Sequence, residues 1–132
     1  MRHHTVKYLI CLISLTMLVV VAAGCRGDDE DVIIRPAAIE DVRVVLAQSY
    51  PPQVFASFKI GLPDSCTTFH DLTTQRQGNT INITVTTQRP RDAVCAQVYQ
   101  FLDKTVDLGS DFTSGQTYTI KVNDKTTTLV MP

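Results

Sequence analysis

The segment from Thr80 to Thr86 alternates strictly between apolar and polar residues, and no other feature constrains the fold as much. Ile81, Ile83 and Val85 fall on one side of an extended backbone, and the polar residues between them fall on the other. A helix would scatter these residues around its axis, because its period is about 3.6 residues. The pattern therefore predicts a strand with one face in a core and the other in water.

Other segments show the same period of two. Residues 39–48 and 53–60 each place apolar side chains on one face: Val42, Val44 and Leu46 in the first, and Val54, Ala56, Phe58 and Ile60 in the second. Further strands are expected at 67–75, 93–102, 105–108, 116–122 and 125–131, and Asn123-Asp124 suits a tight hairpin turn. About seven short strands predict an all-β fold, an immunoglobulin- or fibronectin-like antiparallel β-sandwich, with a small β-barrel as the alternative.

The beginning of the chain has a different character. A short basic head from Arg2 to Lys7 precedes sixteen uncharged residues, Tyr8 to Ala23. That run is shorter than the roughly 20 residues that a membrane-spanning helix needs. A basic head, an apolar middle and a small-residue end are typical of a secretory signal. Residues 1–24 are therefore predicted to be a signal peptide that takes no part in the fold.

The residues Ala22-Ala23-Gly24-Cys25 that follow resemble the lipobox of bacterial lipoproteins. This resemblance implies that the Cys25 sulfur receives a diacylglycerol and that the signal is cut before it. Two or three acyl chains, at about 0.8 kcal/mol per buried methylene, would anchor the chain to a bilayer. The expected location is extracytoplasmic, on a bacterial cell membrane or outer membrane. Residues 25–36, which include the acidic run Asp28 to Asp31, are predicted to be a flexible tether.

Removing 24 of the 132 residues leaves 108, which is enough for one domain, predicted at 37–132. This part has 10 Lys and Arg against 13 Asp and Glu. Outside Arg26 and the acidic run, the count is 9 against 9. Phosphate binding calls for a basic stripe, so a neutral body argues against a nucleic-acid partner.

Two cysteines, Cys66 and Cys95, remain in the predicted exported domain. Export favours a disulfide between them, and closing a loop of about thirty residues would stabilise the fold by about 3 to 4 kcal/mol. We expect the bond to join two strands or the two sheets. A metal site with His70 is disfavoured, because residues four apart on a strand lie about 13 Å apart. No cofactor is expected.

Catalysis is not indicated by the available side chains. His70 is the sole histidine after residue 24, and no nucleophile motif accompanies it. Asp103, Asp107 and Asp111 are the closely spaced carboxylates, and such residues more often lie at strand ends and turns. The chain is therefore predicted not to be an enzyme.

A binding module at the bacterial cell envelope is the function that these features favour. Its partner would be a protein or a polysaccharide, held by loops of the sandwich. Arg89 and Arg91 are weak candidates for contacting an anionic ligand. The alternative is an inhibitor of an extracellular hydrolase that presents one loop to an active-site cleft.

Overall fold

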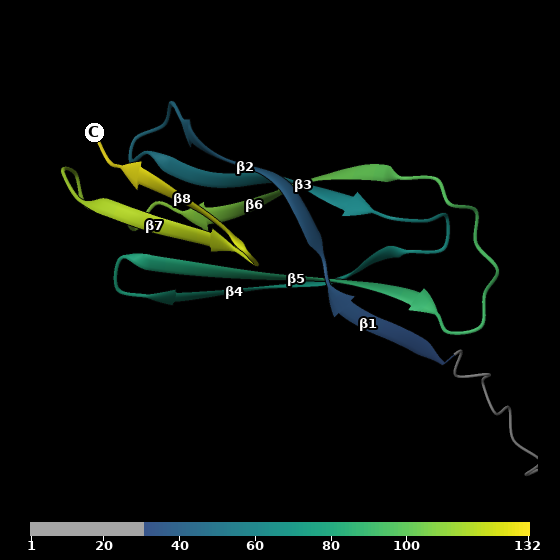
Figure 1. Ribbon diagram of the computed structural model, residues 1–132. Helices are drawn as coiled ribbons and strands as arrows, with labels where there is room; N and C mark the ends of the chain where they lie inside the picture. Colours follow the sequence, from purple (N-terminus) through teal and green to yellow (C-terminus); the bar gives the residue numbers. More distant parts are fainter. Residues whose placement is uncertain (1–30) are drawn as a thin grey trace, which may run out of the picture.

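The computed structural model describes residues 31–132, which form two β-sheets packed against each other (Figure 1). The larger sheet follows the order β1-β5-β7-β8, with β4 on the other side of β5. Its strands are β1 (Val32–Pro36), β4 (Thr68–Gln77), β5 (Thr80–Pro90), β7 (Thr117–Val122) and β8 (Lys125–Val130). The smaller sheet has the order β2-β3-β6, formed by β2 (Ala38–Ala47), β3 (Gln53–Leu62) and β6 (Gln100–Gly109). The all-β sandwich is confirmed.

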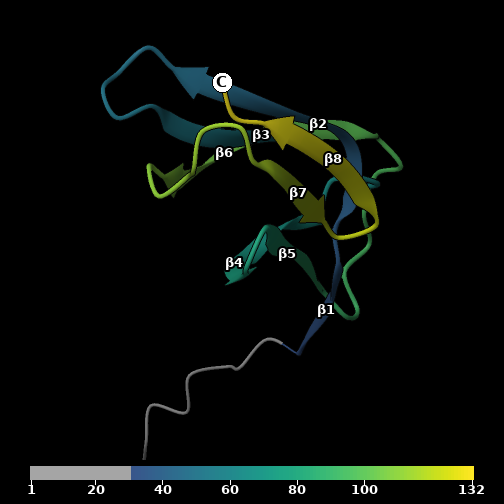
Figure 2. The same cartoon turned by 90° about the vertical axis from the view of Figure 1, so that its left-hand side faces the viewer.

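The core lies between the sheets and follows the period-two pattern. Val54, Ala56, Phe58 and Ile60 of β3 are at most 2% exposed, as are the inward residues of β5. These inward residues of β5 are Ile81, Ile83 and Val85. Figure 2 shows the sheets approaching each other where β2 and β8 lie side by side. Within residues 31–132 no helix is long and apolar enough to cross a membrane.

The sandwich begins earlier in the chain than expected. Residues 32–36, predicted to belong to the tether, form β1 and pair with the end of β5, from Val32↔Pro90 to Pro36↔Thr86. Val32, Ile33 and Ile34 are β-branched and favour an extended backbone, which the neighbouring acidic run obscured. The predicted signal at 1–24, Cys25 and the acidic residues up to Glu30 lie outside the described residues.

The predicted strands 93–102 and 105–108 are also corrected. Residues 93–99 belong to a loop, and β6 runs without interruption through Asp103 and Lys104. Each residue has a partner on β3, in the pairs Lys59↔Asp103 and Phe58↔Lys104. Although Lys104 points inward, it lies at a sheet edge with its Nζ 4.3 Å from the centre of the Phe69 ring. A charged residue at this position does not end the strand, because its methylenes can pack while the ammonium group stays at the edge.

Asn123 holds the junction where three strands meet. It starts the β7–β8 hairpin with a φ of 50°, as the turn prediction required. Its side-chain amide accepts a hydrogen bond from Val85 N at 2.9 Å and donates to the Ala37 and Val85 carbonyls at 2.8 and 2.9 Å. The edge of β5 that faces away from β4 therefore has three successive partners. Residues 80–83 pair with β7, Val85 bonds to the Asn123 side chain, and residues 86–90 pair with β1. The β5–β7 pair is parallel, and the other strand pairs in the described region are antiparallel.

The two ends of the sandwich differ in what they carry (Figure 1). The chain enters β1 at the end that also holds the long loop after β5. The β2–β3 turn and the C-terminus lie at the opposite end.

Candidate functional site

A disulfide joins Cys66 and Cys95, whose Cα atoms are 5.6 Å apart. The bond itself agrees with the sequence prediction, but its position does not. Both cysteines lie in connections between strands, Cys66 before β4 and Cys95 before β6, rather than within strands. Each connection crosses from one sheet to the other, so the disulfide links the two crossovers. Ser65 and Ala96 reinforce the link with two hydrogen bonds of 3.0 Å.

Asp64 lies beside the disulfide and is almost completely buried. Its Oδ1 accepts hydrogen bonds from Cys66 N, Thr67 N and the Thr67 hydroxyl at 3.0, 2.8 and 2.9 Å. Its Oδ2 lies 3.4 Å from Arg89 Nη1. Burial alone would raise the pKa of Asp64, but these hydrogen bonds and the Arg89 charge together hold it below the usual value. The Asp64 carboxylate therefore organises the turn in its charged form.

The two candidate arginines contact carboxylates of their own chain. Besides Asp64, Arg89 donates to the Ala93 carbonyl at 3.3 Å and contacts the Cys95 sulfur. Arg91 pairs with Asp31, with Nε 2.5 Å from Oδ2, and this hydrogen bond lowers the pKa of Asp31. The geometry thus gives both guanidinium groups structural partners, and binding of an anion there stays a prediction.

The residues considered for metal binding or catalysis are engaged elsewhere. His70 Nδ1 lies 2.8 Å from Gln88 Oε1. Asp64, Cys66 and Cys95 bring potential ligand atoms within 4.8 Å of one another, but the two sulfurs are bonded to each other. Asp107 contacts Gln53 Nε2 at 2.6 Å and Gly109 N at 2.8 Å. Among the described residues, His70 thus contacts an amide and Asp107 an amide and a backbone N–H, and neither lies against a nucleophile.

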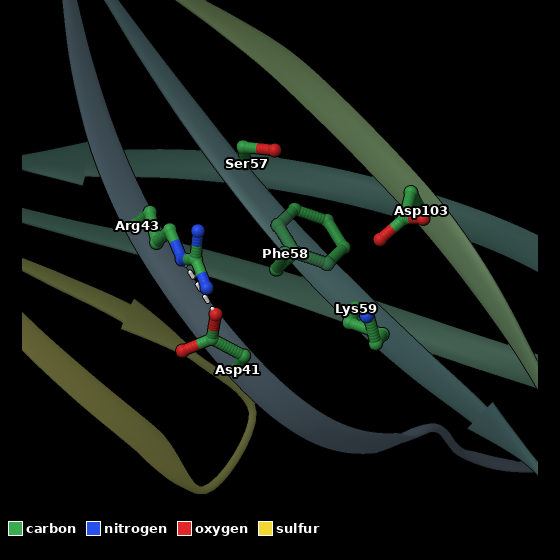
Figure 3. A pocket seen from close by; sticks show the side chains of 6 residues that line it. All are labelled: Asp41, Arg43, Ser57, Phe58, Lys59 and Asp103. Carbon is green, nitrogen blue, oxygen red and sulfur yellow. Dashed lines mark hydrogen bonds and ion pairs between the residues drawn. The ribbon is translucent and has the colours of Figure 1, made fainter.

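The outward face of the smaller sheet holds a different cluster. A shallow depression of about 130 Å³ is lined by charged residues from three neighbouring strands: Asp41 and Arg43 on β2, Lys59 on β3 and Asp103 on β6 (Figure 3). Arg43 Nε donates to Asp41 Oδ2 at 2.7 Å. The strand register places Asp41 and Asp103 on either side of Lys59. We call this the outer-face site.

Two aromatic rings extend the outer-face site toward the disulfide end. Tyr99 and Phe101 are 50% and 59% exposed, and their ring centres lie 5.4 Å apart in an edge-to-face arrangement. Lys59 Nζ lies 5.4 Å from the centre of the Phe101 ring. Both rings remain accessible from solvent in this edge-to-face arrangement, so neither serves to fill the core.

Gly61 allows this arrangement. The Tyr99 hydroxyl lies over Gly61, where a Cβ atom would collide with it. From that position Tyr99 donates a hydrogen bond of 2.5 Å to Glu40 Oε1, and this bond raises the pKa of the tyrosine. The Tyr99 side chain therefore lies across β3 and contacts Glu40 of β2.

Comparison with known proteins gives the family. Residues 56–131 match the model of the ORF11 beta-sandwich domain, which covers more than half of the chain. The chain belongs to this family. The match runs from the middle of β3 to the last buried residue, Met131. The ORF11 beta-sandwich domain thus includes both cysteines of the disulfide.

Three relatives come from Herpetosiphon aurantiacus. The chain is 41% identical over 86 residues to an uncharacterised 10.2 kDa protein in the HgiCIIM 5′ region, covering 65% of this chain and 90% of that protein. It is 43% identical over 76 residues to each of two uncharacterised 10.2 kDa proteins, in the HgiBIM and HgiEIM 5′ regions. Those matches cover 58% of this chain and 92% of each relative. No solved structure matches the chain.

Only part of the outer-face site lies within the residues that match the ORF11 family. Lys59, Tyr99, Phe101 and Asp103 lie inside residues 56–131, whereas Asp41 and Arg43 precede them. Sequence reasoning did not find this site, because its charged residues are far apart in the chain and alternate with core residues. The outward positions of β6 carry Phe101 and Asp103, and an exposed aromatic at an outward position was the available signal.

Proposed function

We propose that this chain is a non-catalytic binding domain that a lipidated Cys25 holds on the extracytoplasmic side of a bacterial membrane. The lipobox resemblance at 22–25 supports the anchor. The disulfide supports export, because such bonds persist in oxidising compartments and are rare in the cytosol. Membership of a β-sandwich family is compatible with this role and carries no activity of its own.

The outer-face site is the observation that carries the proposal. The sandwich buries its core with the inward faces of both sheets, so stability does not require the exposed rings of Tyr99 and Phe101. Exposed aromatic side chains beside a polar depression are typical of binding surfaces.

The chain length between anchor and domain fits this role. Cys25 precedes Asp31 by six residues, which span roughly 20 Å when fully extended. The disulfide end would therefore stay close to the bilayer. The outer-face site lies on the side of the sandwich, where a partner in the envelope can reach it.

Replacement of Cys25 by Ser tests the anchor in the native host. We expect the variant to leave the membrane fraction, while Cys11→Ser, a matched change inside the predicted signal, stays membrane-bound after processing. The intact mass of the wild-type protein should begin at Cys25 and include the acyl chains. A soluble wild-type protein, or a Cys25→Ser variant that is still processed and membrane-bound, would show that the anchor is wrong.

A further inference from the structure

We infer that the outer-face site binds a neutral carbohydrate, with Tyr99 and Phe101 as the surface on which a sugar ring stacks. Lys59 and Asp103 would bind its hydroxyl groups. This inference rests on the proposed binding function and is independent of the membrane anchor. It names the ligand class of a site that is already described by its geometry.

The aromatic pair provides the apolar part of such a site. A pyranose ring has one or both faces covered by C–H groups, whose hydrogens are weakly positive, and the face of an aromatic ring is negative. The edge-to-face arrangement of Tyr99 and Phe101 forms a corner, so a sugar can lie on one ring and touch the edge of the other. The Tyr99–Glu40 hydrogen bond and the space over Gly61 keep this corner in place, which reduces the entropy lost on binding.

The charged residues provide the polar part. A sugar hydroxyl both donates and accepts hydrogen bonds, so it matches a surface where both kinds of group alternate. Asp103 and Asp41 accept, Lys59 and Arg43 donate, and all four line the same depression. Asp103 lies two residues after Phe101 on the same face of β6, and Lys59 lies opposite Asp103 on β3. Stacking and hydroxyl binding can therefore occur on one ligand.

The charge balance favours a neutral ligand over an anionic one. The depression is lined by two cationic and two anionic side chains, so its formal charge is zero. Asp41 and Asp103 would repel an anionic polymer. The site also lacks the basic stripe that binding of a nucleic acid requires. A peptide would be expected to place an apolar anchor in a pocket, but five of the six residues that line the depression of about 130 Å³ are polar or charged.

Affinity electrophoresis of the purified full chain tests the inference directly. The gels contain laminarin, mannan, arabinogalactan or glycol chitin as neutral polysaccharides, and polygalacturonate as the anionic comparison. We expect at least one neutral polymer to retard the protein. Phe101→Ala should weaken that binding by about tenfold or more, as loss of an aromatic anchor does. Tyr50→Ala removes a fully exposed aromatic ring at the opposite end of the sandwich and should leave binding unchanged.

Each other outcome overturns the inference. If none of the four neutral polymers retards the protein, or if polygalacturonate binds more tightly than they do, the ligand class is wrong. If Phe101→Ala and Tyr50→Ala bind equally well, the position of the site is wrong. Thermal melting of both variants confirms that they fold, and Asp103→Asn gives a second, smaller change in the same site. A protein that binds no polysaccharide but is lipidated at Cys25 would retain the proposed anchor and lose only the ligand.

Discussion

Two of the places where the chain passes between the sheets are held by different chemistry. At one end the connections before β4 and β6 are joined by the Cys66–Cys95 bond. Near the middle of β5, where the chain passes from β1 to β2 at Ala37, the junction is held by the Asn123 side chain through three hydrogen bonds. The first junction is a covalent bond between two loops. At the second, side-chain hydrogen bonds of Asn123 take the place of backbone pairing beside β5.

The difference follows from what each place requires. The two loops contribute no side chain to the hydrophobic core, so a cross-link that restricts the unfolded chain stabilises them most. The gap beside Val85 is partly buried, and Val85 N would lack a hydrogen-bond partner without Asn123, while the Val85 carbonyl would keep only Ala37 N. Leaving such groups unpaired costs about 1 to 3 kcal/mol each, and the amide of Asn123 supplies both a donor and an acceptor.

Removal of the disulfide should have the largest effect. Replacing Cys66 and Cys95 together by Ser is expected to lower the free energy of unfolding by about 3 to 4 kcal/mol, because the unfolded chain loses a closed loop. Urea denaturation without reductant measures this difference. Ser65→Ala is the control, since it removes only one hydrogen bond to the same loop. Equal stability of the double variant and the wild type would show that the loops are held by other contacts.

Asn123→Ala should have the second-largest effect. We expect it to lower the free energy of unfolding by about 2 to 3 kcal/mol in the same urea denaturation. The change leaves Val85 N without its partner and places a residue without a polar side chain at positive φ. Asp124→Ala alters the neighbouring turn residue, whose contact is an exposed ion pair with Lys125, and should cost much less. Similar losses in the two variants would assign the effect to the turn rather than to the amide.

Acid should weaken the disulfide end through Asp64. Its pKa is lower in the folded protein than the usual value of about 3.9, so its stabilising contribution is complete above that pH. This contribution is lost as the pH falls through the lowered pKa. The melting temperature of Asp64→Asn should therefore lie below that of the wild type at pH 7, and the gap should close in strong acid. Asp92→Asn, an exposed residue of the same end, is the control. A gap that is constant with pH would exclude a role for the Asp64 charge.

Arg91→Ala should have the smallest effect, because its ion pair with Asp31 is exposed and solvent screens it. Arg89→Ala removes the partner of a buried carboxylate and should lower the melting temperature more. Differential scanning calorimetry at pH 7 compares the two variants. The reverse order would mean that the contact between Asp31, just before β1, and the loop after β5 matters more than the buried pair.

The local pattern predicted most of the fold where side chains alternate clearly. The strands β2, β3 and β5 agree with expectation to within a few residues, apart from a longer end of β5, because one face of each is buried and the period of two is visible. The alternation pattern did not predict β1, which is a short edge strand beside an acidic run, and it gave the wrong limits for β6. The inward Lys104 breaks the apolar pattern of β6, although the Phe69 ring and the strand pairing accommodate it.

The candidate residues divide in the same way. The pairing of Cys66 with Cys95 could be predicted, because these two cysteines remain once the predicted signal at 1–24 and the predicted lipidation site Cys25 are set aside. That the bond joins two crossovers depends on where β3 and β5 end in space. The outer-face site could not be predicted, since Asp41, Lys59 and Asp103 become neighbours only through the register of three strands.

The sequence by itself determined an all-β fold, most of its hydrophobic core and the two cysteines available for a disulfide, because these depend on alternation and on residue inventory. Tertiary structure alone decided the parallel β5–β7 pair, the use of the Asn123 side chain in place of a strand residue, and the meeting of Tyr99 with Gly61. The physical reason is the distance along the chain over which each kind of interaction acts. Alternation acts between neighbouring residues, whereas strand order, register and the contacts between outward side chains depend on segments far apart in the chain.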